Sequence, residues 1–538
     1  MSANPHALPE TDVVVVGAGF TGLYALYKLR QFKLRVQAFE VGSGVGGVWY
    51  WNRYPGARTD SPSQIYQYWF SDELLADWNW SERFIAQEET ERYLNHVADR
   101  FDLRRDITFN TRVTGANFDE ATQRWIVETD TGKRLSAQFL IMGSGGLTEP
   151  VTPDFPGKDS FAGECYHTAR WPREPVDFAG KRVGVIGTGA TGIQVIQTIQ
   201  DKVGHLTVFQ RTAHYTIPMR NPKLDDAARA EMRAKYPELR HYVQTTTTGF
   251  DFNPDPRGYF EMSPEERRAQ MERLWADGSL IFWVGAFADT LMNAEANAEI
   301  SDFVREKIRA RVKDPAVADK LTPRGYGFGT RRVPLETQYY EAFNRPNCTL
   351  VDIAASPIEA ITPTGVKTRD GEYPLDILIY ATGFDAGTGA LTRIDMRGRD
   401  GVLLRDSWKE GIHTFMGLQV RGFPNMFMVM APMSPAAAFC NVPTCSQQQI
   451  DWIADCIDFV RTEGRRAIEP SAAAEAQWVA HHDEVAAATL IPQTDSWYMG
   501  ANIKGKRRSL LAYAGGVGVY KQFCDEVKAK RYEGLDLV

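Results

Sequence analysis

Two glycine-rich segments carry the residue types and spacing that could bind the phosphates of a dinucleotide. The first reads Gly17-Ala-Gly19-Phe-Thr-Gly22, and the second, far downstream, reads Gly187-Thr188-Gly189-Ala-Thr-Gly192. In such a loop the first glycine permits a tight turn, the second lets the backbone approach a pyrophosphate, and the third lets helix and strand pack closely. The following helix points its free N–H groups and positive dipole end at the phosphates. Each segment therefore predicts a dinucleotide site.

The residues at the end of the next strand distinguish the two sites. After the first loop, the strand at residues 36–39 ends on Glu40, whose carboxylate can bind ribose hydroxyls and would repel a 2′-phosphate. After the second, the strand at residues 206–209 leads into Gln210-Arg211-Thr212, and an arginine with a hydroxyl accommodates a 2′-phosphate. The first site predicts FAD, with NAD as the alternative, and the second predicts NADPH. Two such cofactors indicate hydride transfer from NADPH to a flavin.

Short buried strands and the helices between them must position these loops. The β-branched run at residues 12–16 and the run at 181–186 are typical of buried parallel strands, and helices are predicted at 23–30 and 193–200. The segment between about 220 and 325 is rich in charge and helical periodicity, which indicates a helical insertion. The fold class predicted is α/β, with two doubly wound dinucleotide-binding (Rossmann-like) domains and a helical insertion.

The predicted domains are discontinuous, because the chain leaves and re-enters each nucleotide unit. Residues 1–150 and 384–538 are predicted to form the FAD-binding domain, and residues 151–220 and 330–383 the NADPH-binding domain. Residues 221–329 form the predicted insertion. A chain of 538 residues is too long for one compact core. The active site is expected in the cleft between the two nucleotide-binding domains.

Composition argues against several classes of protein. The net charge of −7 gives no dominant basic face for nucleic acid. No stretch approaches the roughly 20 apolar residues that span a bilayer, and no secretory signal is evident, so we expect a cytoplasmic protein without membrane contact. The six cysteines include no C-x-x-C pair, so neither a metal site nor a redox-active disulfide is predicted, and all six are expected as unpaired thiols.

The segment between the two glycine loops carries the most specific pattern. Residues 161–172 have the form F-x-G-x-x-x-H-x-x-x-W-P, which resembles the fingerprint of the type I Baeyer–Villiger monooxygenases, enzymes related to phenylacetone and cyclohexanone monooxygenases. Similar segments extend over nearly the whole chain, at residues 46–49, 51–58, 423–427 and 496–502. The sequence departs from the family pattern at residues 143–145 and 431–434.

The resemblance implies an NADPH- and FAD-dependent enzyme that converts ketones to esters or lactones with O2, through a C4a-peroxyflavin. It places Arg332 at the active-site arginine beside the flavin and Asp60 at the acid that orients this arginine. Arg331 matches the basic residue that helps Arg211 hold the 2′-phosphate. His167 is expected to make hydrogen bonds in a linker, with a general base as the alternative.

Three further cofactor contacts follow from the resemblance. Gly47, in Gly46-Gly47-Val-Trp49, belongs to the flavin side, and Trp49 is expected to pack near the flavin as a structural residue. Trp497 matches a tryptophan of a loop that closes over the nicotinamide, with a simple hydrophobic anchor as the alternative. Met433, Phe439, Asn441 and residues 245–252 are candidates for lining the substrate pocket.

Other flavin-dependent functions remain as alternatives. An N- or S-oxygenating monooxygenase uses an electrophilic oxidant, which needs no cation such as Arg332 to stabilise an anion. An NADPH-dependent flavin reductase would predict a redox-active cysteine pair or a docking surface for a protein partner. The predicted partners are a small-molecule ketone and O2, with no nucleic acid or membrane. The natural ketone and the oligomeric state stay open.

Overall fold

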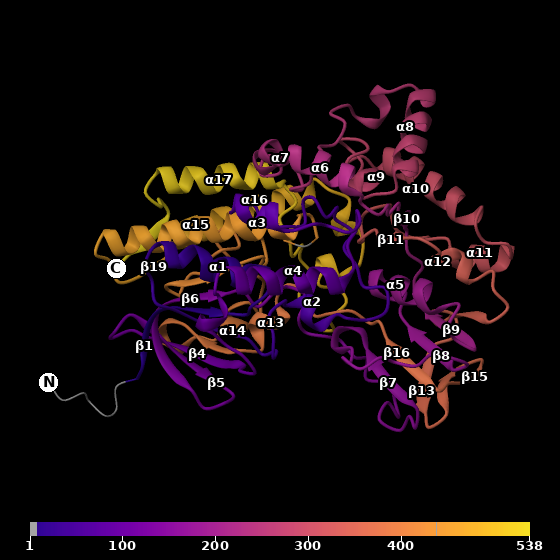
Figure 1. The fold of residues 1–538 in the computed structure, drawn as a ribbon, viewed down its shortest axis with the longest axis horizontal. Helices are drawn as coiled ribbons and strands as arrows, with labels where there is room; N and C mark the ends of the chain where they lie inside the picture. Colours follow the sequence, from indigo (N-terminus) through magenta and orange to yellow (C-terminus); the bar gives the residue numbers. More distant parts are fainter. Residues whose placement is uncertain (1–7, 437) are drawn as a thin grey trace.

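Two α/β units and a group of helices make up the computed structural model, which describes residues 8–436 and 438–538. Figure 1 shows the first unit on the left, the second at the lower right, and the helices of the middle of the chain above the second unit. The yellow C-terminal helices lie on the first unit, so both ends of the chain contribute to it.

The first unit is built on an eight-stranded sheet in which β1 (Glu10–Val16) lies between β6 and β2. Val13, Val14 and Val15 of β1 are wholly buried, as a strand covered on both faces requires. Parallel pairing places Val14 opposite Leu140 on one side and Gln37 on the other. The other strands are β2 (Val36–Phe39), β3 (Ile107–Thr108), β4 (Val113–Asp119), β5 (Arg124–Thr129), β6 (Arg134–Met142), β17 (Asp395–Arg397) and β18 (Met426–Met428).

The second unit contains a five-stranded sheet in the order β12-β9-β8-β16-β7, in which every pair is parallel. Its strands are β7 (Glu164–His167), β8 (Arg182–Ile186), β9 (His205–Gln210), β12 (Cys348–Asp352) and β16 (Ile377–Tyr380). A three-stranded antiparallel sheet of β13 (Ile358–Thr362), β14 (Gly365–Thr368) and β15 (Gly371–Pro374) lies beside it in Figure 1. Thus residues on both sides of the insertion complete one parallel sheet.

A helix follows each glycine loop directly. α1 (Phe20–Gln31) begins after Gly19 and α5 (Ala190–Ile199) begins after Gly189, so the helices predicted at these places are confirmed. α1 packs against α15 (Val442–Thr462), where the Tyr24 hydroxyl donates to Asp451 at 2.7 Å and Lys28 lies 2.8 Å from the same carboxylate. The C-terminal helix α15 therefore fixes the helix that carries the first loop.

The middle of the chain is helical, as its periodicity predicts. It forms α6 (Asp226–Ala234), α7 (Tyr236–Tyr242), α8 (Pro264–Asp277), α9 (Ile281–Val284), α10 (Ala294–Arg309) and α11 (Pro315–Leu321). Side-chain caps start the two long helices: Ser263 and Glu266 form a capping box on α8, and Asn293 caps α10. The segment begins and ends next to the parallel pair β10 (Ile217–Pro218) and β11 (Leu335–Glu336).

The remaining elements connect and cover these units. They are α2 (Val48–Trp51), α3 (Asp72–Asp77), α4 (Gln87–Arg100), α12 (Tyr339–Ala342), α13 (Gly389–Thr392), α14 (Leu404–Ser407), α16 (Ala472–Ala487), α17 (Val517–Ala529), β19 (Ile468–Pro470) and β20 (Leu535–Leu537). Within the described ranges, no helix is long and apolar enough to cross a membrane.

One disulfide corrects the prediction that all six cysteines are unpaired thiols. A disulfide joins Cys440 to Cys445, whose Cα atoms lie 6.6 Å apart, whereas the sequence predicted unpaired thiols throughout. The chain turns from residues 438–441 into the first turn of α15, and this turn brings the two sulfurs together. Cys165, Cys348, Cys456 and Cys524 are free thiols, as expected.

A half-buried histidine joins three segments of the C-terminal part. His413 Nδ1 lies 2.9 Å from Glu475 of α16, and His413 Nε2 lies 2.8 Å from the Ser407 hydroxyl. The hydrogen bond to Glu475 raises the pKa of His413 above its ordinary value, although burial opposes this. Since the folded protein stabilises the protonated ring, this contribution to stability is complete below the unfolded pKa and is lost as the pH rises through the raised folded pKa.

We predict that His413→Asn lowers the Tm of the protein by an amount that depends on pH. The difference between wild type and variant should be largest near about pH 6, below the ordinary histidine pKa of about 6.5, and should shrink above the raised pKa. Thermal denaturation of both proteins at several pH values measures this difference. Glu475→Gln should reproduce the same trend, and an equal difference at pH 6 and pH 9 would contradict the role of the ion pair.

Candidate active site

A single large cavity of about 1750 Å³ brings both glycine loops and the charged candidates together, and we call it the main cavity. The predicted site residues that line it are Gly17, Gly19, Glu40, Gly47, Trp49, Asp60, Gly187, Thr188, Gly189, Arg211, Thr212, Arg331, Arg332 and Trp497. Gly22 and Gly192 do not line it, because each lies under its helix, where an added Cβ would collide with the carbonyl oxygen of the first glycine of its own loop. Both therefore serve packing rather than contact.

The first loop forms a turn that only glycine tolerates. Gly17 has a φ of +100°, and an added Cβ would lie 2.6 Å from the carbonyl oxygen of Gly143. The Glu40 carboxylate accepts hydrogen bonds from the backbone N–H groups of Ala18 (2.8 Å) and Gly42 (2.7 Å). Burial raises the pKa of Glu40, and these two hydrogen bonds oppose the rise. The acid at the strand end thus also holds the loop itself, and the open glycine backbone beside it fits a flavin nucleotide.

The second loop opens onto a cationic region. Nothing lies within 4 Å of a Cβ added to Gly189, so this backbone is accessible from the cavity. The Thr188 hydroxyl donates to the carbonyl oxygen of Thr212 at 3.2 Å, which ties the loop to the strand end. Arg211 is exposed, and Arg331 is half-buried with a buried Nε that has no hydrogen-bond partner among the described residues. Two guanidinium groups around an open glycine loop fit a dinucleotide that carries an extra phosphate.

Arg332 and Asp60 form an ion pair that faces the main cavity. The Arg332 guanidinium also lies over the ring of Trp283, 5.3 Å from its centroid. Burial lowers the pKa of Arg332, but Asp60 and Tyr498 outweigh this, so its pKa is raised above the ordinary value. The site therefore holds a permanent cation with donor groups directed by a carboxylate.

The helical middle segment positions the loop that carries Arg332. Asn297 of α10 donates to the carbonyl oxygens of Phe328 and Thr290, both at 2.8 Å. Ser301, one turn later, accepts from the backbone N–H of Phe328 at 2.9 Å. Gly329, with a φ of +81°, lets the backbone lie against the indole of Trp283. The segment is thus held at Phe328 by buried hydrogen bonds from α10 and at Gly329 by packing against Trp283 of α9.

The loop that carries Asp60 is held from the other side. Thr59 donates its backbone N–H to Ile85 at 2.9 Å, and the N–H of Gln87 donates to Ala57 at 2.9 Å. The Tyr54 hydroxyl donates to Gln194 of α5 at 2.8 Å, so the same loop is attached to the helix of the second nucleotide unit. Both partners of the ion pair are therefore fixed before any ligand binds.

The structure adds aromatic and polar residues that the sequence did not indicate. Tyr498, Trp283, Tyr66 and His214 all line the main cavity. The Tyr498 hydroxyl and the Trp283 indole N–H are buried without a hydrogen-bond partner among the described residues. Burial lowers the pKa of His214 to about 4, so its ring is neutral near pH 7. Tyr498 could have been noted beside Trp497, whereas nothing in the sequence distinguishes Trp283.

The candidates for lining the substrate pocket divide into two groups. Thr248, Phe250 and Phe439 face the main cavity, as predicted. Met433 and Asn441 do not, which corrects the prediction for both. Asn441 is buried and donates to the carbonyl oxygen of Ile65 at 2.8 Å, and Met433 is buried in the core.

His167 lies outside the lining of the main cavity. Its Nδ1 accepts from the backbone N–H of Ala169 at 3.0 Å, and its Nε2 lies 3.4 Å from the carbonyl oxygen of Val151 and 3.3 Å from the Thr382 hydroxyl. Burial lowers the pKa of His167. These contacts join the segments around residues 151, 167 and 382, where the chain passes between the two units.

Comparisons with known proteins agree with this arrangement. Residues 10–220 match the family described as Flavin-binding monooxygenase-like. The chain is 50% identical over 527 residues to the acetone monooxygenase (methyl acetate-forming) of Gordonia sp. (strain TY-5), covering 98% of this chain and 99% of that relative. It is 40% identical over 531 residues to the cyclohexanone 1,2-monooxygenase of Acinetobacter sp, covering 98% and 97%.

A solved structure is also similar over its whole length. The crystal structure of OTEMO in complex with FAD and NADP superimposes with a TM-score of 0.95 at 43% sequence identity, covering 99% of this chain and 100% of that chain.

We predict that Asn297→Ala destabilises the protein through the segment that carries Arg332. The substitution leaves two buried carbonyl oxygens unsatisfied, so the free energy of unfolding should fall by about 1–3 kcal/mol. Chemical denaturation of wild type and variant measures the change. Gln244→Ala is the matched control, because among the described residues the Gln244 side chain donates only to the carbonyl oxygen of Arg240, within one turn of chain. Equal losses for the two variants would contradict a special role of Asn297.

Proposed function

The chain belongs to the Baeyer–Villiger monooxygenases, and we propose that its chemistry is centred on the Arg332–Asp60 pair in the main cavity. It is an enzyme that uses FAD and NADPH to convert ketones to esters or lactones. The observation that supports the proposed centre is the position of one half-buried, permanently charged arginine in the cavity that both glycine loops share.

The proposed cofactor contacts follow the two loops. Gly17, Gly19, Glu40 and Gly47 would hold FAD, with Trp49 packed beside it through a hydrogen bond from its indole N–H to the Tyr66 hydroxyl at 3.0 Å. The second loop, with Thr212, Arg211 and Arg331, would hold NADPH. When bound, NADPH supplies a hydride and FAD carries the oxygen atom that is delivered to the ketone.

Arg332 is proposed to stabilise negative charge on the oxygen of the ketone. A fixed cation with several N–H donors, in a site shielded from water, lowers the energy of an anion far more than water-exposed groups do. Asp60 aligns the guanidinium and keeps it charged. Tyr498, whose buried hydroxyl lies beside Arg332, is a neutral donor that accompanies the cation in the same cavity. Oxidation of nitrogen or sulfur has no comparable need for this cation.

The apolar part of the main cavity is proposed to accommodate the body of the ketone. Phe250, Leu280 and Phe439 lie on this wall. The rings of Trp497 and Tyr498 make a T-shaped contact with 4.5 Å between their centroids. We propose that residues 496–502 cover the nicotinamide. O2 is the proposed second substrate, and a cytoplasmic location stays a prediction.

Oxygen insertion by the enzyme can be followed with labelled O2. Purified enzyme given NADPH, 18O2 and a pool of cyclic, aromatic and linear ketones should form esters or lactones that carry one labelled oxygen. Arg332→Met should reduce this product formation by about 100-fold to 1,000-fold, because the developing charge loses its main donor. Mass spectrometry of the products, with NADPH consumption followed in parallel, measures both.

The variants separate this role from cofactor binding. Arg332→Met should still consume NADPH and release hydrogen peroxide. Asp60→Asn should show an intermediate loss, since it misaligns the arginine without removing it. If Arg332→Met formed labelled ester at the wild-type rate, the proposed centre would be wrong, whatever the family.

The choice between NADPH and NADH depends on the two arginines beside the second loop. Arg211→Gln and Arg331→Gln should each raise the KM for NADPH by about 10-fold, since a charge-assisted contact to phosphate contributes about 1.5–3 kcal/mol. The KM for NADH should change little, because NADH has no 2′-phosphate. Steady-state kinetics with both nucleotides measures the ratio. Arg369→Gln is the control, because Arg369 lies on the exposed hairpin of the second unit.

A further inference from the structure

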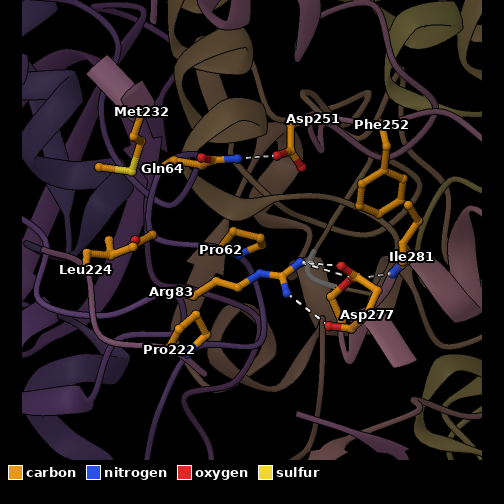
Figure 2. A pocket seen from close by; sticks show the side chains of 12 residues that line it. Pro62, Gln64, Arg83, Pro222, Leu224, Met232, Asp251, Phe252, Asp277 and Ile281 are labelled. Atoms are coloured by element: carbon orange, nitrogen blue, oxygen red, sulfur yellow. Dashed lines mark hydrogen bonds and ion pairs between the residues drawn. The ribbon is translucent and has the colours of Figure 1, made fainter. Parts of the chain in front are cut away.

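A second, smaller cavity of about 350 Å³ lies between the first nucleotide unit and the helical middle segment, and we call it the side pocket. Figure 2 shows its side chains converging from the two parts of the chain. It is lined by Pro62, Ser63, Gln64, Arg83, Pro222, Leu224, Met232, Asp251, Phe252, Asp277, Ser279 and Ile281. Its volume is at the lower end of the range of about 300–1,000 Å³ that small-molecule sites have.

The side pocket shares a wall with the main cavity. Along residues 248–252, Thr248 and Phe250 line the main cavity, whereas Asp251 and Phe252 line the side pocket. Residues 279–284 divide in the same way, with Leu280 and Trp283 on one side and Ser279 and Ile281 on the other. Asp60 and Ser61 line the main cavity, and the next three residues line the side pocket. The two spaces are therefore separated by single segments of chain.

One polar group of the side pocket has unused hydrogen-bonding capacity. Asp251 accepts from the side-chain amide of Gln64 through Oδ2, and its Oδ1 accepts no hydrogen bond from another described residue. Burial raises the pKa of Asp251, which favours the neutral acid. A neutral carboxyl group can donate a hydrogen bond as well as accept one.

The second charged group is already paired. Arg83 donates to the backbone carbonyl of Asp277 at 3.0 Å and to both carboxylate oxygens of Asp277 at 3.1 and 3.2 Å. Figure 2 shows this pair across the pocket from Asp251 and Gln64. Both terminal nitrogens of the guanidinium are therefore engaged within the protein.

These groups limit the class of ligand. An anion would meet two carboxyl groups and a guanidinium that is already paired. A cation would meet the guanidinium and a carboxyl group whose burial disfavours its charged form. A pure hydrocarbon would leave Asp251 desolvated without a partner, which costs about 1–3 kcal/mol. The remaining class is a neutral molecule with an apolar body and one oxygen.

We propose that the side pocket is a second binding site for a small neutral molecule with an apolar body and one oxygen, held by a hydrogen bond to Asp251 and by apolar contacts. Phe252, Ile281, Met232 and Leu224 supply the apolar contacts. The class of ligand follows from the side pocket alone. Its identification with the ketone substrate or the ester product of this enzyme rests on the proposed function.

Bromine-labelled ligands locate this site directly. Crystals of the oxidised holoenzyme, which cannot turn over without NADPH, are soaked at millimolar concentration in 4-bromoacetophenone or in its ester, 4-bromophenyl acetate. Anomalous diffraction should show bromine in the side pocket for one or both, and the stronger peak distinguishes ketone from ester. 1-Bromo-4-ethylbenzene, which has no oxygen, and anionic 4-bromobenzoate should give no peak there.

Variants test the same site from the protein side. Leu224→Trp fills the side pocket and should abolish the bromine peak, and Asp251→Leu should do the same if the tryptophan variant does not fold. Met292→Trp, at an exposed position of the same helical segment, should leave the peak unchanged.

Two outcomes would overturn the proposal: no bromine in the side pocket with either carbonyl compound, or an equal peak with 1-bromo-4-ethylbenzene. The labelled-oxygen assay is independent of these crystals. Normal ester formation without a peak would therefore reject the side pocket and leave the proposed function intact.

Discussion

The half-buried ion pair between Arg332 and Asp60 is the interaction on which the rest of the proposed site depends. Partial removal of each ion from water is unfavourable, and a half-buried charge without its partner is more unfavourable still. The protein meets this cost with groups from distant parts of the chain: the loop at residues 57–60, the indole of Trp283, and Tyr498 near the C-terminus. Each of these must be in place before the cation can face an enclosed cavity, so the site requires the whole fold.

The two nucleotide units share one backbone geometry and differ in charge. In both, a glycine with positive φ starts the turn. The last glycine of each loop lets the helix pack against the carbonyl oxygen of that first glycine, so the two loops share one geometry. The difference lies at the strand ends, where Glu40 is buried and Arg211 is exposed. Tyr54 and Gln194 connect the units through a 2.8 Å hydrogen bond beside the ion pair. The proposed active centre therefore lies beside a contact between the two units.

Much of this arrangement follows from the sequence, and its limits have physical causes. The strands and helices around Gly17 and Gly187 are predictable because the required turn geometry restricts the residue types. Arg332 and Asp60 are recognisable only through a resemblance, since arginine pairs and turn aspartates are common on surfaces. Trp283, the side-chain directions of Met433 and Asn441, and the Cys440–Cys445 disulfide depend on how loops fold back, for which no sequence periodicity exists.

The helical middle segment is part of the active-site scaffold rather than an appendage. It leaves and re-enters the second unit at the adjacent strands β10 and β11, which pair in parallel, so a long segment can be accommodated without disturbing the main sheet. At this junction Arg311, two residues after the end of α10, forms an ion pair with the buried carboxylate of Glu336 in β11. Since α10 holds Phe328 before Arg332 and β11 begins at Leu335 after it, the segment that carries Arg332 is held on both sides. Because the two ends of the middle segment are joined through β10 and β11, substitutions on its exposed helices can leave the position of the Arg332 guanidinium unchanged.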